Sequence, residues 1–230
     1  MIPKTLHYCW FGNGKKPKGF EKYRASWERC LPGFEIIEWN EQNYDYRKSS
    51  YMVEAYDAGK YAYVSDFARC DILNRYGGLY VDTDVEMLQV LPSSLLQEEA
   101  FGGREYTGQV NMGLIWGSER AHPFLARMLE SYERDNFEIA ASWQSYYTVV
   151  QRAMDILRME GLHEDDIEEN AFGVHIFPSE VFCAYDAKRR APRITENTIS
   201  VHHYDASWLS PYEKVRRAAG TLLRRVGFHG

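Results

Sequence analysis

The stretch that decides the fold is Gly77-Gly78-Leu79-Tyr80-Val81-Asp82-Thr83-Asp84. Its paired glycines end a helix, and the apolar residues after them predict a short buried strand. Alternate residues of a strand share a face, so the carboxylates of Asp82 and Asp84 are expected to point the same way. Neighbouring buried carboxylates repel each other. Our hypothesis is therefore that a divalent cation such as Mn²⁺ or Mg²⁺ binds between them. Two solvated acids at a strand end are the alternative.

The helix expected before this stretch covers residues 61–76, whose apolar side chains recur with helical spacing. Asp66 and Arg69 are three residues apart and therefore share one face of that helix. The glycine turn brings the helix back against the acidic pair, where Arg69 could balance the carboxylates or hold a phosphate. The alternative is a surface ion pair, which contributes roughly a few tenths of a kcal/mol.

Elsewhere the chain alternates predicted strands and helices, which is typical of an α/β fold. Strands are expected at 4–10, 34–39, 110–116, 174–177 and 198–203, and helices at 18–30, 121–134, 143–159 and 211–226. No repeat or low-complexity linker interrupts the sequence. We therefore expect one α/β domain over residues 1–210, followed by a basic amphipathic helix over 211–230.

Charge, cysteine content and hydropathy exclude several classes of protein. The net charge of −6 does not suit a nucleic-acid-binding surface, which is basic. The four cysteines form no CxxC motif and no Cys/His cluster, so buried free thiols in a reducing compartment are expected. Because the sequence shows neither a signal peptide nor a membrane-spanning run, it predicts a cytoplasmic protein.

The segment 211–230 differs in charge from the rest of the chain. It carries five basic residues and one acidic residue among apolar positions. A helix of this kind either lies on an anionic membrane surface or packs on its own domain with a solvated basic face. The sequence leaves both open, so peripheral contact with the inner face of a membrane is one expectation.

Three motifs together resemble glycosyltransferase family 32, which includes the yeast initiating α-1,6-mannosyltransferase and bacterial capsule and lipopolysaccharide transferases. One is Ser65-Asp66-x-x-Arg69 with the following glycine and acidic stretch, an arrangement similar also to that of the clostridial glucosylating toxins. The others are the opening Ile2-Pro3-Lys4-Thr5-Leu6-His7-Tyr8-x-Trp10-Phe11-Gly12 and the late His202-His203-Tyr204-x-x-Ser207-Trp208. The resemblance implies a GT-A fold, a Rossmann-like mixed sheet flanked by helices.

The resemblance also implies how a nucleotide-sugar donor would be held. Trp10 would stack on the nucleotide base, and Tyr80 would support the nucleotide. The helix residues Ser65, Asp66 and Arg69 would contact the ribose and the donor sugar. In such a fold the nucleotide would lie at the carboxyl ends of the first strands, where open α/β sheets bind ligands.

A metal shell follows from the same resemblance. Asp84 would bind the metal directly, and Asp82 would be shared between the metal and the ribose. His202 and His203 are neighbours on a predicted strand, so only one of them can face the site. His202 is favoured as the further ligand. The toxins have a glutamate in this late loop where the present chain has histidines.

Three further residues receive roles by resemblance: Ser207 and Trp208 would close over the diphosphate, and Asn111 would orient the acceptor or the donor sugar. The predicted activity is retaining transfer of a hexose or N-acetylhexosamine to a saccharide or lipid-linked acceptor, in bacterial surface polysaccharide synthesis. A UDP-sugar is the default donor, and GDP-mannose is the second choice. A haloacid dehalogenase-type phosphatase with an aspartate nucleophile and a non-catalytic sugar-binding protein are the alternatives.

Overall fold

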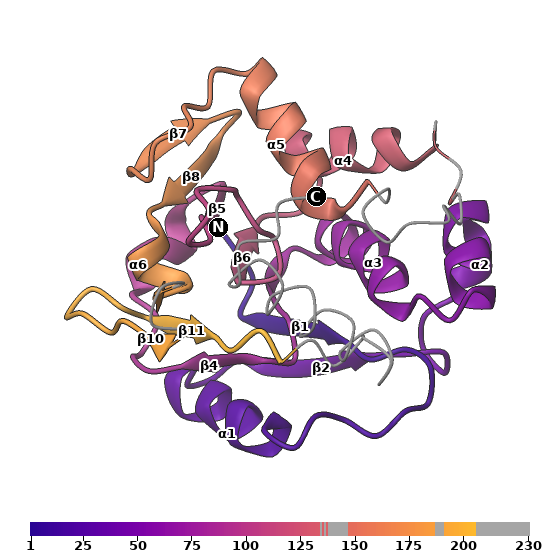
Figure 1. The fold of residues 1–230 in the computed structure, drawn as a ribbon, viewed down its shortest axis with the longest axis horizontal. Helices are drawn as coiled ribbons and strands as arrows, with labels where there is room; N and C mark the ends of the chain where they lie inside the picture. Colours follow the sequence, from indigo (N-terminus) through magenta and orange to yellow (C-terminus); the bar gives the residue numbers. More distant parts are fainter. Residues whose placement is uncertain (134, 136, 138–146, 187–190, 206–230) are drawn as a thin grey trace, which may run out of the picture.

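The computed structural model describes residues 1–133, 135, 137, 147–186 and 191–205. Within these ranges, the main sheet has seven strands in the order β2-β1-β3-β6-β5-β8-β7 (Figure 1). They are β1 (Thr5–Cys9), β2 (Glu35–Trp39), β3 (Gly78–Val81), β5 (Ala100–Gly103), β6 (Ile115–Ser118), β7 (Glu169–Ala171) and β8 (Val174–Phe177). The β1–β2, β1–β3 and β5–β8 pairs are parallel, and the other pairs are antiparallel. The predicted α/β fold with a mixed sheet is confirmed.

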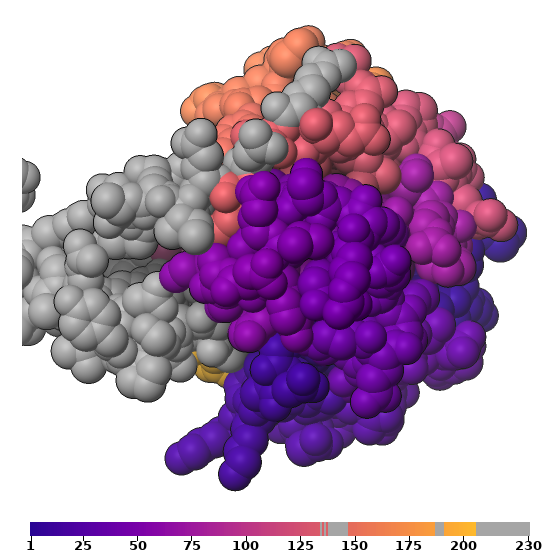
Figure 2. All heavy atoms as spheres, turned by 90° about the vertical axis from the view of Figure 1, so that its right-hand side faces the viewer, coloured from indigo at the N-terminus to yellow at the C-terminus, as the bar shows by residue number. Residues whose placement is uncertain are grey.

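Helices cover both faces of this sheet, and a hydrophobic core lies on each side. Leu79 and Val81 of β3 face the core shared with α1 (Phe20–Cys30), whereas Tyr80 faces the opposite core. This alternation is the period of two expected for a strand buried on both faces. The second core is formed with α2 (Ser50–Asp57), α3 (Tyr61–Tyr76), α4 (Pro123–Glu133) and α5 (Val149–Met159). Figure 2 shows this side, with α2 and α3 in purple below the pink and orange segments.

Smaller elements complete the described part of the chain. Two antiparallel pairs are formed by β4 (Val85–Met87) with β11 (Ser200–His202) and by β9 (Tyr185–Asp186) with β10 (Ala191–Pro192). The short helices are η1 (Tyr46–Lys48), η2 (Ser93–Gln97) and α6 (Ser179–Phe182). The β4–β11 pair sets His202 opposite Val85, and so brings a late segment of the chain beside the acidic pair.

The turn between α3 and β3 forms where the sequence predicts it. The helix expected at 61–76 is α3, and it ends directly before Gly77. Gly77 and Gly78 have φ of 66° and 99°, in the left-handed region that glycine adopts without strain. A Cβ at Gly78 would lie 2.6 Å from the carbonyl oxygen of Thr5, so glycine also permits β3 to pair closely with β1.

The acidic pair does not lie on a strand, contrary to the prediction. β3 ends at Val81 and β4 begins at Val85, so Asp82, Thr83 and Asp84 form a turn. The N–H of Val85 donates to the carbonyl of Asp82 at 3.2 Å and closes this turn. The two carboxylates therefore come together through the turn, and strand alternation is not the reason.

The strand expected at 110–116 is also shorter, because β6 begins only at Ile115. The side-chain oxygen of Asn111 accepts a hydrogen bond from the N–H of Gly113 at 2.7 Å, which holds a turn before the strand. The carbonyl of Gly113 accepts from the N–H of Asp82 at 2.9 Å. This turn therefore lies directly against the acidic pair.

The helix expected at 143–159 begins later, at Val149, because Thr148 and Gln151 form a capping box. Residues 143–146 and the predicted helix at 211–226 lie outside the described residues, so the division of the chain at residue 210 stays a prediction. The four cysteines are buried and free, as expected. Within the described ranges, none of the helices has the length and apolar character needed to cross a membrane.

Candidate functional site

A cavity of about 620 Å³ opens at one edge of the main sheet. β1 and β3 are parallel, so Trp10 and Asp82, which follow these strands, emerge at the same edge. β6 is antiparallel to both β3 and β5, so β5 runs in the direction of β3 and also ends here. All of the predicted site residues within the described ranges line this cavity. Open α/β sheets bind ligands at this edge.

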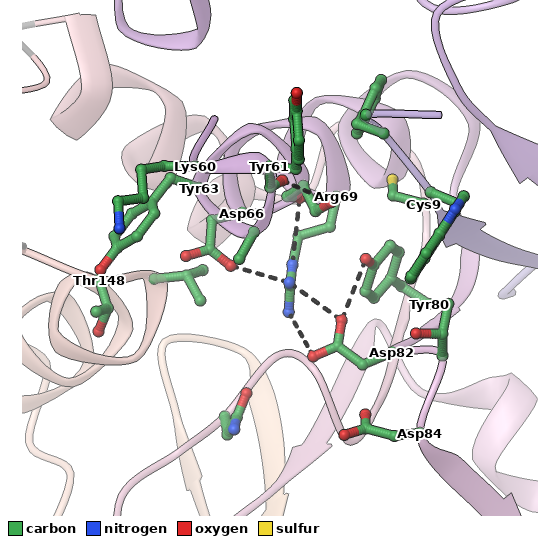
Figure 3. Close-up of a pocket in the computed structure, with 18 of the residues that line it drawn as sticks. Cys9, Lys60, Tyr61, Tyr63, Asp66, Arg69, Tyr80, Asp82, Asp84 and Thr148 are labelled. Carbon is green, nitrogen blue, oxygen red and sulfur yellow. Dashed lines mark hydrogen bonds and ion pairs between the residues drawn. The ribbon is translucent and has the colours of Figure 1, made fainter. Parts of the chain in front are cut away.

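Arg69 holds the centre of the site together (Figure 3). Its side chain is 5% exposed, and its Nη2 lies 2.9 Å from Asp66 Oδ1 and 3.1 Å from Asp82 Oδ1. Its Nη1 donates to the other oxygen of Asp82 at 3.5 Å, and its Nε donates to the carbonyl of Ser65 at 3.3 Å. The guanidinium also lies 4.7 Å from the centre of the Tyr80 ring. Of the two roles open for Arg69, the structure therefore favours balancing the carboxylates over holding a phosphate.

Burial shifts the pKa values of the acidic residues in this cluster, and Arg69 opposes these shifts. Burial raises the pKa of Asp66 to about 6, although Arg69 and the N–H of Val149 act against the rise. Burial likewise raises the pKa of Asp82, with Arg69 again opposing. The carboxylates in turn outweigh the burial of Arg69 and hold its pKa well above the usual value. The cluster thus depends on one buried cation between two acids.

The remaining predicted residues of the donor side line the same cavity. The Tyr80 hydroxyl, on a fully buried ring, donates to Asp82 Oδ1 at 3.3 Å. The Ser65 hydroxyl donates to the carbonyl of Tyr61 at 3.2 Å, one turn earlier on α3. Trp10 is half-buried, and its indole N–H donates to the carbonyl of Gly14 at 2.8 Å. This hydrogen bond holds the indole ring against the loop after β1.

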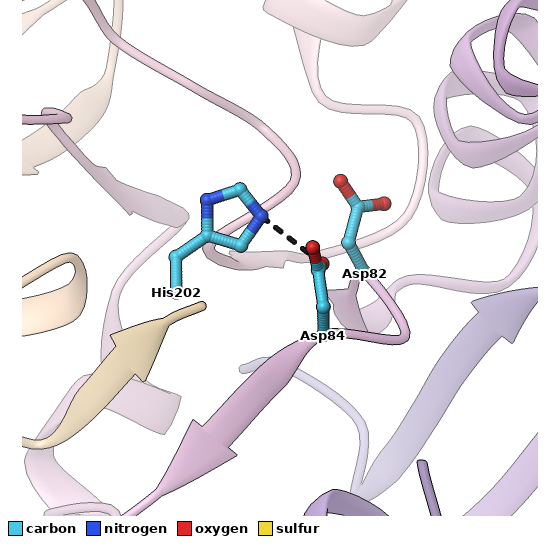
Figure 4. A group of neighbouring side chains, drawn as sticks. All are labelled: Asp82, Asp84 and His202. Atoms are coloured by element: carbon cyan, nitrogen blue, oxygen red, sulfur yellow. Dashed lines mark hydrogen bonds and ion pairs between the residues drawn. The ribbon is translucent and has the colours of Figure 1, made fainter. Parts of the chain in front are cut away.

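Asp82, Asp84 and His202 form the second feature of the site (Figure 4). One potential ligand atom from each of the three lies within 4.8 Å of the others. His202 Nε2 is 3.0 Å from Asp84 Oδ1, and the N–H of Asp205 donates to Asp84 Oδ2 at 3.0 Å. Burial acts to raise the pKa of Asp84 and to lower that of His202. The contact between the two side chains outweighs burial, so the pKa of Asp84 is lowered and that of His202 is raised.

The three side chains fit a hard divalent cation. The two carboxylates are oxygen ligands of the kind that Mn²⁺ and Mg²⁺ prefer, and the imidazole adds one nitrogen ligand. The Nδ1 atom of His202 is buried and has no hydrogen-bond partner among the residues that the structure describes. His203, the neighbouring candidate, points away: its Nε2 is 2.9 Å from Glu86, and its ring stacks on Tyr23 at 4.6 Å. His202 is therefore the histidine available to a metal.

Several cavity residues were not predicted from the sequence. Glu105 follows β5 and accepts a hydrogen bond from the Tyr204 hydroxyl at 2.9 Å. Lys60 and Thr148 line the end of the cavity away from Asp84 in Figure 3. For Thr148 a signal was present, because a threonine followed three residues later by glutamine marks the start of a helix. Glu105 has no such local signal.

Asn111 lines the cavity, where its side-chain oxygen is occupied by the N–H of Gly113. Ser207 and Trp208, the predicted flap over the diphosphate, lie outside the described residues. Their roles stay predictions, as do the individual roles assigned to the other residues of the site.

Comparison with known proteins identifies the region that contains Asp66, Arg69, Asp82 and Asp84. Residues 17–102 match the family described as the glycosyltransferase sugar-binding region containing a DXD motif. The chain is 28% identical over 59% of its length to inositol phosphoceramide mannosyltransferase 3 of Schizosaccharomyces pombe, covering 38% of that protein. It is 34% identical over 37% of its length to an uncharacterized glycosyltransferase of Acanthamoeba polyphaga mimivirus, covering 36% of it. The chain thus spans well under half of these relatives.

A solved structure supports the fold. A glycosyltransferase involved in glycosylation of the major capsid of PBCV-1 aligns over 94% of this chain and 100% of its own, with a TM-score of 0.50 and 11% identity. At this identity the likeness concerns the fold alone. The chain therefore has the GT-A fold of this solved glycosyltransferase, and its residues 17–102 match the DXD-containing sugar-binding region of glycosyltransferases.

Proposed function

We propose that the protein is a metal-dependent retaining glycosyltransferase, which moves a hexose or N-acetylhexosamine from a nucleotide sugar to a saccharide or lipid-linked saccharide. The observation that carries this proposal is the convergence of Asp82, Asp84 and His202 within 4.8 Å beside the buried Arg69. A divalent cation held there would supply positive charge to the diphosphate as the sugar–phosphate bond breaks. Retention of anomeric configuration is proposed from the family resemblance.

Five residues of the site have proposed tasks in this reaction. Asp84 and His202 would hold the cation, and Asp82 would be shared between the cation and the ribose. Arg69 keeps Asp82 in place by contacting both of its oxygens. Trp10 offers a steadied ring face to the base. Much of the rate enhancement would then come from positioning the substrates and from preorganised charge.

The donor and the acceptor are proposed at the level of chemical class. UDP-sugars are the first donors to test, and the mannosyltransferase relatives of fission yeast make GDP-mannose the second. One relative is named for action on inositol phosphoceramide, a lipid, which supports including lipid-linked acceptors. A role in bacterial surface polysaccharide synthesis and membrane contact through residues 211–230 stay predictions from the sequence.

A donor screen tests the proposed function. The protein is expected to hydrolyse at least one nucleotide sugar slowly in the presence of Mn²⁺, because water can replace the acceptor. Removing the cation with EDTA is expected to lower this rate by about 100-fold or more, and added Mn²⁺ is expected to restore it. Release of the nucleoside diphosphate, measured by chromatography, reports the reaction.

The same screen separates the alternatives. Hydrolysis of phosphomonoesters with none of nucleotide sugars would favour the phosphatase. Binding of sugars without turnover of any donor would favour a non-catalytic sugar-binding protein. Donor hydrolysis that is unchanged in EDTA would contradict the proposed role of the cation.

A substitution at Gly113 tests the site without removing any functional group. A Cβ at this position would lie 2.0 Å from Asp82 Oδ2 and 2.9 Å from Arg69 Nη1, so Gly113→Ala must displace the carboxylate. We expect Mn²⁺ affinity, measured by calorimetry, to fall by about 10- to 100-fold, as when other supports of metal ligands are lost. In Gly14→Ala, where a Cβ meets nothing within 4 Å, the affinity is expected to stay at the wild-type value. Equal affinities in the two variants would show that the position of Asp82 does not matter.

A further inference from the structure

Glu105 is held at the cavity by a rigid loop. The loop joins β5 to the turn before β6, and its shape is fixed by hydrogen bonds from Glu105 N–H to Gln109 O at 2.8 Å and from Gly108 N–H to Glu105 O at 2.8 Å. Arg104, whose side chain is fully buried, anchors the loop by donating to the carbonyls of Gly108 and His163 and by pairing with Glu169. The backbone of Glu105 is therefore fixed independently of any ligand.

The Glu105 carboxylate differs from the other carboxylates in the cavity. Asp66 and Asp82 contact Arg69, and Asp84 contacts His202. Over the described ranges, Glu105 forms no ion pair at contact distance, and its side chain accepts one hydrogen bond, from the Tyr204 hydroxyl to Oε2. Its other oxygen has no hydrogen-bond partner among those residues. A carboxylate with an open oxygen can accept hydrogen bonds from ligand hydroxyls.

The order of the strands places Glu105 on the far side of the acidic turn from Trp10. Along the sheet edge β1 lies on one side of β3, and β5 lies on the other side with β6 between. Adjacent strands are about 4.8 Å apart, so the end of β5 is on the order of 10 Å from the end of β3. A donor with its base on Trp10 and its diphosphate at Asp84 leaves this distance, about the length of two sugar rings, for the donor sugar and for a second substrate.

We propose that Glu105 binds the acceptor and selects a neutral hexopyranoside, with its open carboxylate oxygen accepting hydrogen bonds from ring hydroxyls. This inference rests on the proposed glycosyltransferase function. Tyr204 positions the carboxylate: its hydroxyl holds Oε2, its backbone has a φ of 52°, and its ring packs on His202 at 4.1 Å. Glu105, which orients the acceptor, is thus connected through Tyr204 to the segment that carries His202.

Charge explains why the acceptor should be neutral. The cavity is lined by the carboxylates of Asp66, Asp82, Asp84 and Glu105 and by the lysines Lys15 and Lys60. Arg69 and His202, the two side chains that contact the aspartates, form no ion pair with Glu105 among the described residues. An acceptor carboxylate placed at Glu105 would be repelled by the Glu105 carboxylate at close range, which is costly at a half-buried position. Hydroxyl groups, in contrast, donate hydrogen bonds to Glu105.

The test measures how donor turnover divides between transfer and hydrolysis. The full chain is incubated with Mn²⁺ and its best donor, together with methyl hexopyranosides of gluco, galacto and manno configuration or with methyl glucuronide. Wild type is expected to transfer to at least one neutral hexoside in preference to the glucuronide. In Glu105→Gln, the ratio of transfer to hydrolysis is expected to fall about tenfold or more, because the charged hydrogen bond is lost. In this variant, the ratio of transfer to the hexoside to transfer to the glucuronide is expected to fall as well.

Glu99→Gln is the matched control, since Glu99 is an exposed acid at the opposite end of β5. Its ratio of transfer to hydrolysis is expected to equal that of wild type. An equal ratio in Glu105→Gln and Glu99→Gln would overturn the inference, and so would a wild type that prefers the glucuronide or transfers to none of the hexosides. A wild type that hydrolyses no donor would instead contradict the proposed function itself.

A double substitution tests the link to Tyr204. Tyr204→Phe removes the hydroxyl and keeps the ring, so it should raise the acceptor KM with little change in kcat. If Tyr204 acts through Glu105, adding Tyr204→Phe to Glu105→Gln raises the KM no further, because the two changes are coupled. Effects that multiply would show that Tyr204 does not position Glu105.

Discussion

Replacing Asp84 with asparagine is expected to lower Mn²⁺ affinity and donor hydrolysis by more than about 100-fold each. Losing a supporting residue alone typically costs 10- to 100-fold, and Asp84 is the proposed direct ligand. The substitution keeps the size of the side chain and an oxygen that can still accept from the N–H of Asp205. The fold should therefore persist, and the loss should come from the missing negative charge. Calorimetric titration with Mn²⁺ and chromatography of the released nucleoside diphosphate measure the two effects.

Glu86→Gln is the control for this substitution. Glu86 lies two residues further along the chain, on β4, where it pairs with Lys22 and is 2.9 Å from His203. Glu86 is thus a nearby carboxylate that does not belong to the group of Asp82, Asp84 and His202. Its substitution should leave Mn²⁺ affinity within about threefold of wild type, as expected for a pair with one exposed partner. If Asp84→Asn binds Mn²⁺ as tightly as Glu86→Gln, Asp84 is not a ligand.

The parts of the fold that the sequence predicts well are those determined by local interactions. The helix 61–76 and its glycine stop depend on helical spacing and on the conformational freedom of Gly77 and Gly78, which are visible over a few residues. Asp66 and Arg69 share a face for the same local reason, and their ion pair follows from it. The contact between Arg69 and Asp82 could be anticipated because a short turn joins the two elements.

The parts that the sequence does not predict depend on contacts between distant segments. The turn at Asp82 follows from hydrogen bonds to Val85 and to Gly113, and Gly113 belongs to a segment that sequence patterns predict as a strand. His202 lies 118 residues from Asp84 and reaches it because β11 pairs with β4, a contact that only the family resemblance anticipates. Glu105 reaches the cavity only because the strand order puts β5 two places from β3. None of these relations has a signature in the neighbouring residues.

Arg69→Met is expected to destabilise the protein by about 3–5 kcal/mol in the absence of metal. The methionine fills most of the space, but it removes the cation that faces Asp66 and Asp82 within 3.1 Å at a site where the arginine is 5% exposed. Removing one partner of a buried ion pair leaves an uncompensated charge, which accounts for the size of the effect. Since Asp82 also loses its two contacts to the guanidinium, donor hydrolysis should fall by about 100-fold or more. Urea unfolding measures the stability.

The pH dependence of this destabilisation distinguishes lost charge from lost packing. Burial already raises the pKa of Asp66 to about 6 in the folded state, and the loss of Arg69, which opposes that rise, should raise it further. A folded pKa above the unfolded value of about 3.9 means that the folded state binds protons more tightly, so its stability falls as pH rises through that interval. Arg69→Met should therefore lose more stability at pH 8 than at pH 5. Arg75→Met, which removes a half-exposed arginine of the same helix, should cost about 0.5 kcal/mol or less at both pH values. A loss for Arg69→Met that is equal at the two pH values would assign its effect to packing and contradict the charge balance.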